Sequence, residues 1–442
     1  MKFRRNARSG RAALWAAVLS FAVCASAANA DETIAFIGAR LIRVDSPELP
    51  TGVLIVRDGR ILAVGAAADT NVPPDARRID VTGKVIMPGI VDTHNHIGGI
   101  GGGDQSKPLH PDVRIYDSLN PRDAGFRRAV AGGLTTLNIM PGSGHLLSGQ
   151  TVYVKLRPAH TIEEMAVRNA DGLIAGGIKM ANGTNSRGGA PFPGTRAKSA
   201  ALVREMFIRA VEYQSKVTAA GDDASKKPDR DLGLEALGEV LSGKRVVHHH
   251  THRADDIVTV LRLSKEFGFR VVLHHVSEAW MVADEIAAAG ARCSVILVDS
   301  PGGKLEASQL SYETAAILDR AGVNVAFHTD DWITDSRLFL RMAALGVRGG
   351  LPREKALRAL TLSGAEMLDL QDRVGSLTVG KDADFVVLDG DPLSVYSKVL
   401  ETWVEGRRVF DRNDPQDRLY GVGGYGAGFD TVPYMCCHGD GE

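Results

Sequence analysis

Histidines gather at the ends of apolar, strand-like runs along this 442-residue chain. His94 closes the run IMPGIVDTH, and Asp330 closes the run VNVAFHTD. Neutral imidazoles and a carboxylate are the ligands that borderline cations such as Zn²⁺ prefer. In a parallel barrel the carboxyl ends of all strands meet at one rim. The sequence therefore predicts a metal site at such a rim. The histidines at or just beyond strand-like ends are His94, His96, His248, His249, His250, His252, His274, His275 and His328.

Strand alternation indicates which of these histidines can reach the same ion. Residues two apart share a face of a strand, so His94 and His96 can bind one cation from a single strand end. By the same rule His248, His250 and His252 share one face, and His249 points the other way. A lone histidine at a strand end is more often a hydrogen-bonded core residue. Four such strand ends together favour metal binding.

The pair His274 and His275 leaves the register of the site open. Alternation places His275 on the face of Leu273, opposite His274, so only one of the two histidines is expected to face the metal. Which histidine of each neighbouring set binds metal is not decided by spacing alone. A protein that only sequesters zinc or copper through HHHTH is the non-catalytic alternative.

Strand-rich flanks enclose the histidine-rich region. Residues 31–88 alternate apolar and polar positions between turn residues, and residues 375–411 repeat that character. Between the flanks, strand-like and helix-like runs alternate about every 25 residues, which indicates parallel βα units. We predict an α/β protein whose (β/α)8 TIM-type barrel spans 89–370. Residues 31–88 and 371–415 form a small composite β-sandwich domain, and 416–442 are a Gly-rich tail. A doubly wound open sheet is the alternative.

One of the helix-like runs, ADDIVTVLRLSKEFG, illustrates how these elements cover the strands. Its apolar residues Ile257, Val260 and Leu261 follow helical spacing, and Gly268 is a typical helix stop. The run therefore predicts an outer-layer helix that packs one face against the sheet.

The first thirty residues predict an export signal. A basic segment, MKFRRNARSGR, precedes the apolar run AALWAAVLSFAV, and Ala28-Asn29-Ala30 is a small-x-small cleavage site. We therefore expect residues 1–30 to be a signal peptide and the mature protein to be periplasmic or secreted. No membrane association is expected after cleavage. A short N-terminal membrane anchor is the alternative, although the apolar run is shorter than a spanning helix needs.

Charge and cysteine content exclude further classes. The whole chain has a net charge of −1, and the signal segment contains basic residues but no acidic ones. The mature chain is therefore acidic, which disfavours a nucleic-acid partner. Cys293, Cys436 and Cys437 remain after cleavage, an odd number that forms no disulfide framework. The Cys436-Cys437 pair is at most a weak metal or redox signal.

Several motifs together resemble a known family. PGIVDTHNH, IKMANG, HHHTHRADDI, VVLHHVSEAW, FHTDD and VGSLTVGKDADFVVLDGDP resemble the metal-dependent amidohydrolase superfamily, in its imidazolonepropionase-like and prolidase-like branch. The resemblance extends over nearly all of the mature chain to about residue 410. It implies a metal site formed by His94, His96, Lys179, His250, His275 and Asp330.

The resemblance also implies roles for two of these residues. Lys179 matches a lysine that is carbamylated and bridges two divalent metals, expected to be Zn²⁺ with Mn, Co or Fe as alternatives. Asp330 matches the catalytic aspartate that binds metal and handles the proton of the nucleophilic water. If Lys179 is unmodified, a mononuclear site is expected instead.

The implied function is an exported amidohydrolase that cuts an amide or peptide C–N bond. A dipeptide, an N-acyl amino acid or a cyclic amide is the expected small-molecule substrate. The alternative is a mononuclear deaminase or a hydrolase of an imidazolone-type cyclic amidine. Oligomeric state is left open, with a homo-oligomer as one option. Candidate substrate contacts from loops after strand-like runs are His145, Asn182, Arg187 and Trp332.

Overall fold

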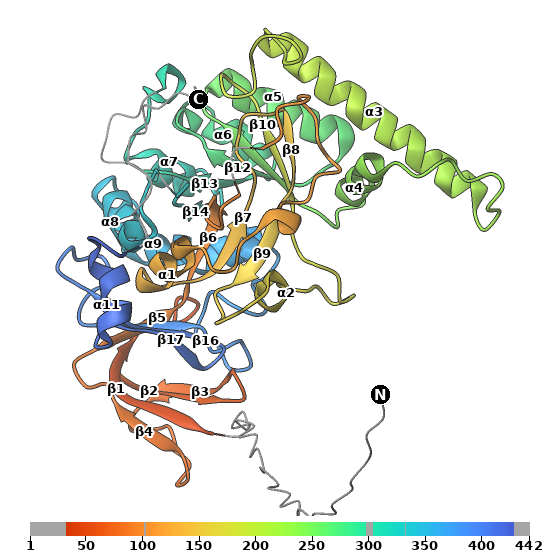
Figure 1. Cartoon of the computed structure of the whole chain (residues 1–442). Coiled ribbons are helices and arrows are strands. Elements are labelled where there is room, and N and C mark those ends of the chain that lie inside the picture. The colour runs from red at the N-terminus through yellow and green to blue at the C-terminus, as the bar shows by residue number, and fades with distance from the viewer. Residues whose placement is uncertain (1–31, 101–102, 298–303, 332, 428–442) are drawn as a thin grey trace, which may run out of the picture.

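The computed structural model describes residues 32–100, 103–297, 304–331 and 333–427. The described chain has a mixed α/β fold, with a β-rich part at one end and a helix-covered set of strands at the other (Figure 1). The predicted signal segment, Trp332 and the Cys436-Cys437 pair lie outside the described residues. Within the described part, no helix combines the length and apolar character that crossing a membrane requires.

The β-rich end is one sheet that both flanks of the chain build. β5 pairs antiparallel with β15, so strands about 300 residues apart in sequence are neighbours. The rings of Phe36, Phe385 and Trp403 pack together on this sheet, with centroids 4.9 to 5.6 Å apart. The sheet has the order β17-β16-β15-β5-β1-β2-β3, with β4 beside β1. Its strands are β1 (Ile34–Leu41), β2 (Leu49–Arg57), β3 (Arg60–Ala66), β4 (Arg77–Asp80), β5 (Val85–Pro88), β15 (Phe385–Leu388), β16 (Val399–Val404) and β17 (Arg407–Asp411).

The strands that carry the histidines form two further sheets. A six-stranded sheet has the order β14-β13-β12-β11-β10-β8, and a three-stranded sheet has the order β6-β7-β9. Asn95 and Asp331 form a parallel bridge between the end of β6 and the segment after β14. The strands are β6 (Ile90–Asn95), β7 (Leu134–Ile139), β8 (Leu147–Gln150), β9 (Val152–Lys155), β10 (Ile178–Ala181), β11 (Val247–Thr251), β12 (Val271–His275), β13 (Arg292–Val295) and β14 (Val325–Phe327).

Parallel pairing holds along β10 to β14, as the alternating βα pattern predicts. β8 and β9 differ, since β8 is antiparallel to β10 and β9 is antiparallel to β7. Parallel neighbours need a crossover of a dozen or more residues. Only residues 140–146 separate β7 from β8, so the chain returns in the opposite direction.

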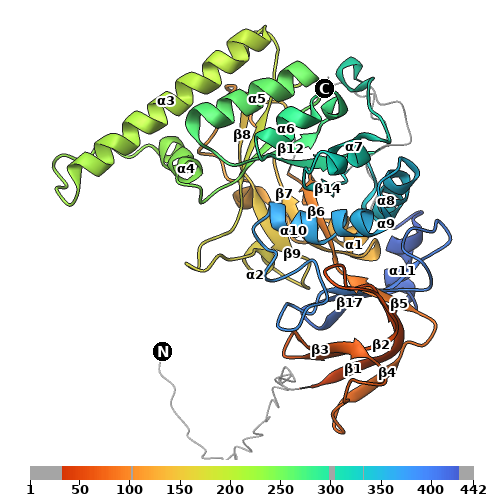
Figure 2. The same ribbon diagram turned by 180° about the vertical axis from the view of Figure 1, so that it is seen from behind.

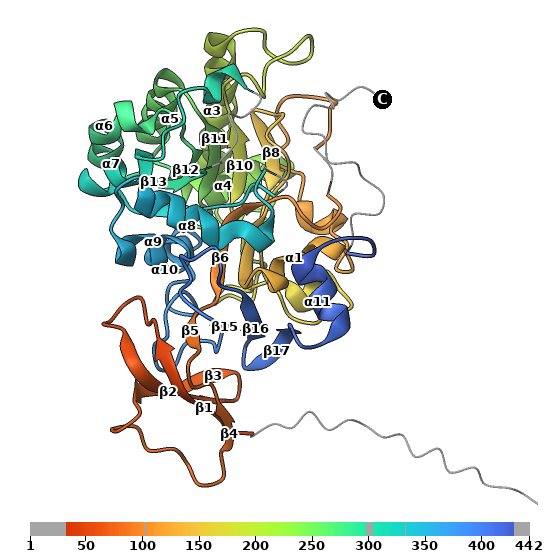
Figure 3. The same cartoon turned by 90° about the vertical axis from the view of Figure 1, so that its left-hand side faces the viewer.

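Helices cover the outside of the six-stranded sheet (Figures 1 and 2), and the long helix α3 projects from it. α5 is the helix expected from ADDIVTVLRLSKEFG: Ile257, Val260 and Leu261 are buried, and Gly268 ends it with a φ of 75°. In Figure 3, the strands β10 to β13 lie next to one another, with α6, α7 and α9 outside them. The helices are α1 (Ala124–Ala131), α2 (Ile162–Met165), α3 (Arg196–Ala220), α4 (Leu232–Leu241), α5 (Ala254–Phe267), α6 (Ala283–Ala288), α7 (Thr314–Arg320), α8 (Phe339–Arg348), α9 (Arg353–Ala359), α10 (Leu362–Met367) and α11 (Pro415–Val422).

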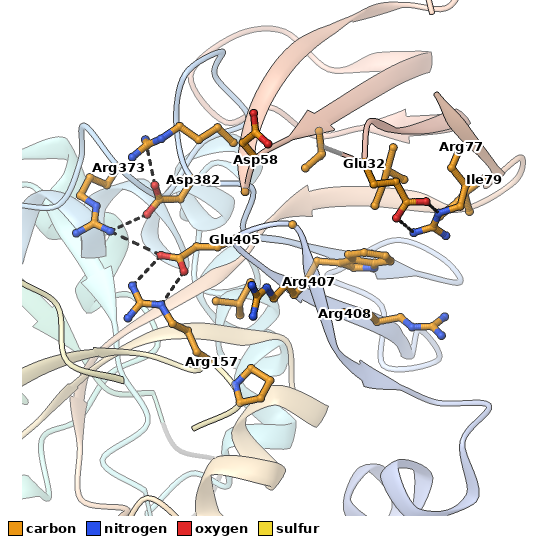
Figure 4. A pocket seen from close by; sticks show the side chains of 18 of the residues that line it. Glu32, Asp58, Arg77, Ile79, Arg157, Arg373, Asp382, Glu405, Arg407 and Arg408 are labelled. Atoms are coloured by element: carbon orange, nitrogen blue, oxygen red, sulfur yellow. Dashed lines mark hydrogen bonds and ion pairs between the residues drawn. The ribbon is translucent and has the colours of Figure 1, made fainter. Parts of the chain in front are cut away.

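A buried ionic network joins the β-rich end to the rest of the molecule. Lys155, at the end of β9, lies 2.8 Å from Asp382 and 2.7 Å from Asp384, which precede β15. Glu405 forms two hydrogen bonds with Arg157. These groups adjoin a cavity of about 1060 Å³ between the two regions (Figure 4). The network holds the small sheet against β9 at the end of the strands away from the histidines.

Candidate metal centre

The two histidines of the HxH pair and Asp330 converge as the sequence predicts. His94 lies in β6 and His96 directly after it, and their Nε2 atoms are 3.1 Å apart. Asp330 Oδ1 is 3.0 Å from His96 Nε2 and 3.4 Å from His94 Nε2. Burial alone raises the pKa of Asp330, but its hydrogen bond with His96 and the charges around it lower that pKa overall. Asp330 is therefore an ionised carboxylate at the centre of the cluster.

Lys179 enters the same cluster from β10. Its side chain is fully buried, and its Nζ lies 3.0 Å from His94 Nε2 and 3.0 Å from Met140 Sδ. Among the described residues, no carboxylate forms an ion pair with it within 4 Å. Burial lowers the pKa of Lys179 to about 7, because the charged ammonium is poorly solvated there. A large share of this amine is therefore neutral near pH 7.

A second cluster adjoins the first and consists of His250, His252 and His275. The ring centroids are 4.3 Å apart for His250 and His275, and 4.7 Å apart for His250 and His252. The three rings offer nitrogen atoms within 4.8 Å of one another. His252 is a ligand candidate that the prediction left out, although strand alternation already places it on the face of His250.

The backbone of β12 departs from alternation at its last residue. His275 has a φ of 70° and Val276 a φ of 48°, both in the left-handed region. As a result His274 and His275 both lie against His94, with ring centroids 4.9 and 4.8 Å away. The expectation that they point to opposite faces is wrong. Asp330 has a similar conformation, with a φ of 49°.

The histidine registers along β11 follow the alternation rule. His248 lies inside, where its Nδ1 is 3.0 Å from His274 Nε2. His249 lines a different cavity, of about 580 Å³, beside α3 and α5. His328 is inside as well, with its Nε2 3.1 Å from His275 Nδ1 and its Nδ1 2.8 Å from Ser294 Oγ. Thus His248, His274 and His328 form a layer behind the candidate ligands.

The donor set fits divalent metal. Zn²⁺ binds nitrogen and oxygen at about 2.1 Å, which places tetrahedral ligand atoms about 3.4 Å apart. The separations between His94, His96 and Asp330 are of this size. In the second cluster the Nε2 atoms of His250, His252 and His275 are buried without a hydrogen-bond partner in the described structure. Buried polar atoms are normally satisfied, so these nitrogens are poised for a cation.

The candidate substrate contacts are more scattered. His145 is buried beside Phe192 and His110, with ring centroids 5.4 and 5.6 Å away. Asn182 follows β10 and donates to the Asp256 carbonyl. Arg187 donates to the Gly183 carbonyl, and Trp332 lies outside the described residues. Their role in substrate binding stays a prediction.

Comparison with known proteins identifies the family of this chain. Residues 159–410 match the model of the Amidohydrolase family. Amidohydrolase tasK of Hapsidospora irregularis is 28% identical over 395 residues, which cover 81% of this chain, and the chain spans 40% of that protein's length. An imidazolonepropionase of Micrococcus luteus is 27% identical over 401 residues, covering 79% of this chain and 91% of the relative.

A solved structure extends the agreement to the fold. The crystal structure of an amidohydrolase from Thermotoga maritima MSB8 is 34% identical and superposes with a TM-score of 0.80. The match covers 86% of this chain and all of that one. The predicted family is thereby confirmed, and a purely metal-sequestering protein is disfavoured. This chain belongs to the amidohydrolase family, a family of metal-dependent hydrolases that act on carbon–nitrogen bonds.

Proposed function

We propose that the protein is an exported amidohydrolase that cleaves an amide or peptide C–N bond at a binuclear metal centre. The observation that carries this proposal is the pair of adjoining clusters. His94, His96 and Asp330 suit one cation, and His250 and His275 suit a second. Two clusters that meet around His94 and His275 are more than a mononuclear site needs.

Lys179 supports the binuclear form. As a neutral amine it can attack CO₂, so that an N–C bond forms and one proton leaves the nitrogen for solvent. The resulting carbamate carries a negative charge and two oxygens, which suits two cations. The position of Lys179 Nζ, 3.0 Å from His94 Nε2, places such a group beside the first cluster.

Asp330 would handle the proton of the reaction. A divalent cation bound here supplies Lewis acidity, which favours deprotonation of water and stabilises negative charge on the substrate oxygen. The ionised Asp330 carboxylate accepts the proton of the attacking water and passes it to the leaving nitrogen. His96 Nδ1 lies 2.8 Å from the Met140 carbonyl oxygen, which leaves His96 Nε2 free to bind the same cation as Asp330.

The proposed substrates are dipeptides, N-acyl amino acids or cyclic amides outside the cytoplasm, as the predicted export signal implies. The proposed metal is Zn²⁺. The second candidate function is a mononuclear hydrolase of a cyclic amidine. The similarity to imidazolonepropionases favours it, and the first cluster alone offers enough ligands for one ion.

The first experiment measures metal equivalents in protein purified without chelator and with bicarbonate present. About two equivalents per chain support the binuclear proposal, and about one supports the mononuclear alternative. None, with no activity after zinc, manganese or cobalt is added, would contradict both.

A second experiment tests turnover with a panel of dipeptides, N-acyl amino acids, cyclic amides and cyclic amidines. Asp330→Asn is expected to abolish hydrolysis of the preferred substrate while leaving most of the bound metal, because the amide oxygen still coordinates but takes up no proton. Arg204→Gln, on α3 in an exposed ion pair with Glu266 of α5, serves as the control with unchanged activity. Full activity of Asp330→Asn would refute the assigned role.

A further inference from the structure

The two strands that lead to the first cluster belong to different sheets. β6 is in the three-stranded sheet and β14 is in the six-stranded sheet. Their ends meet at the isolated bridge of Asn95 with Asp331. The Asp330 N–H also donates to the His94 carbonyl oxygen over 3.0 Å. His94 and His96 can share a cation with Asp330 only while these ends stay together, so the groups between them decide the geometry of the cluster.

The carboxylate of Asp92 joins these two ends. Asp92 lies in β6 and is fully buried, and Thr329 follows β14. Oδ1 of Asp92 accepts from the backbone N–H groups of His94 and Thr329, at 3.2 and 3.1 Å. Oδ2 of Asp92 accepts from the Asn95 side-chain amide at 2.8 Å and from the Thr329 hydroxyl at 2.6 Å. Three of these four donors are amide nitrogens, which only donate, so both carboxylate oxygens act as acceptors.

The Thr329 hydroxyl extends the connection to the far side of Asp330. It accepts from the Asn95 amide at 3.1 Å and from the Asp331 N–H at 3.0 Å. The residues on both sides of Asp330 are therefore fixed to β6, and both are buried. Asp330 itself has a φ of 49°. A non-glycine residue keeps such a conformation only where the surrounding structure imposes it. The hydrogen bonds around Asp92 supply that constraint.

We propose that Asp92 is a positioning residue that locks the end of β6 to the segment after β14 and so holds the candidate ligands of both within reach of one cation. The inference rests on the proposed metal centre. It adds to that centre a carboxylate whose two oxygens bind groups behind the ligating atoms. Partners of this kind orient metal ligands, and their loss weakens metal binding.

Asp92→Asn tests the connection with the smallest change of shape. Asn keeps the size of Asp but replaces one acceptor oxygen by an NH₂ group, which then faces two donors. Buried donors without an acceptor are strongly disfavoured, so the two strand ends should move apart. Zinc affinity of the metal-stripped protein should fall about tenfold or more, as is common for changes behind metal ligands. Competition with a chromogenic chelator, in buffer that contains bicarbonate, measures it.

The matched control is Asp384→Asn, at the other end of the molecule. Asp384 is also a buried carboxylate, which accepts from the Glu405 N–H at 2.8 Å and lies 2.7 Å from Lys155. This variant should lower the thermal unfolding temperature but leave zinc affinity unchanged. An equal loss of zinc affinity in Asp384→Asn and Asp92→Asn would trace the effect to general destabilisation and would overturn the positioning role.

Two changes at Thr329 test the same connection without altering a charge. Thr329→Val removes the hydroxyl that donates to Asp92 and accepts two hydrogen bonds, whereas Thr329→Ser keeps it. Val preserves the packing and Ser preserves the hydrogen bonds. A positioning role therefore predicts weakened zinc binding in Thr329→Val and wild-type binding in Thr329→Ser, and a packing role predicts the reverse.

The outcomes separate this inference from the proposed function. Wild-type zinc affinity in both Asp92→Asn and Thr329→Val would overturn the inference alone, because the metal centre would still be present. A wild type that binds no zinc would overturn the proposed function itself, and the inference with it.

Discussion

Lys155 and Lys179 are buried to the same degree in opposite surroundings. Lys155 is 1% exposed and lies between two carboxylates at 2.7 and 2.8 Å. Lys179 is fully buried, and its neighbours are a histidine nitrogen and a methionine sulfur. A buried ammonium needs charged partners to offset its lost hydration. Lys155 has such partners and is part of the framework, whereas Lys179 lacks them and becomes a neutral amine available for chemistry.

The difference indicates that pairing with carboxylates, more than burial, decides whether a buried lysine stays charged. The cavity in Figure 4 makes the same point, since its arginines and acids are mostly paired with one another. At the histidine-rich end, by contrast, several buried nitrogens have no partner in the described structure.

The largest effect is expected at Lys179. If Lys179 carries the proposed bridging carbamate, Lys179→Met should lower hydrolytic activity by at least about a hundredfold and reduce bound metal by one equivalent. The free energy of unfolding of the metal-free protein should change by less than about 1 kcal/mol, since Met is apolar and of similar length.

A companion variant, Lys179→Ala, leaves space for a small carboxylate. Acetate or propionate at high concentration should restore part of its activity by supplying the missing negative group. If Lys179→Met were fully active and still bound two metal ions, Lys179 would have no chemical role that distinguishes it from Lys155.

Lys155→Met should show the reverse pattern. Removing the ammonium leaves Asp384 as an unpaired buried carboxylate, and the free energy of unfolding should fall by about 3–5 kcal/mol. Chemical denaturation of the metal-free protein measures this change. Metal content of the folded fraction should remain that of wild type, and loss of metal without loss of stability would contradict the framework role.

Acid should weaken the same network. Burial alone raises the pKa of Glu405, but Arg157 and Lys155 lower it to about 2, below its usual value of 4.5. A depressed folded-state pKa stabilises the protein above about pH 4.5, and this stabilisation is lost as the pH falls towards 2. At pH 7 the free energy of unfolding of the wild type should exceed that of Glu405→Gln by about 2 kcal/mol. Denaturation curves should show this difference disappearing below about pH 4. A gap that is independent of pH would exclude this ionic contribution.

The smallest effect is expected at the exposed rim of the network. Arg60 lies 3.1 Å from Asp382, but its side chain is 55% exposed. Solvent screens such a pair, so Arg60→Gln should change the free energy of unfolding by less than about 1 kcal/mol. If Arg60→Gln lowered the free energy of unfolding as much as Lys155→Met, solvent exposure would not explain the difference between the two ion pairs.

The candidate metal ligands were the part of the molecule most accessible from sequence. His94 lies at the end of β6 and His96 directly follows it, and Asp330 follows β14, so local alternation and strand ends were enough to bring the three residues together. The inward position of His274 was not predicted, because the left-handed backbone of His275 turns both side chains inward. A pattern based on ideal strands contains no signal for such a departure.

The pairing within the ionic network had no local signal, although Asp382 and Asp384 lie in the motif VGSLTVGKDADFVVLDGDP. Lys155 meets Asp382 and Asp384 across more than two hundred residues, and nothing in either segment indicates the partner. Likewise the antiparallel direction of β8 and β9 follows from the short connection after β7. The average spacing of the βα repeats does not reveal this one short connection.

The left-handed residues beside the candidate metal centre affect how the enzyme can evolve. His275, Val276 and Asp330 hold positive φ angles that non-glycine residues adopt at a penalty of about 1–3 kcal/mol each. Glycine at any of them would relieve that penalty, and at 275 or 330 it would delete a candidate ligand. A library of variants selected for thermostability alone should therefore drift towards inactive glycine variants at 275 and 330. Selection for turnover keeps the chain below its attainable stability.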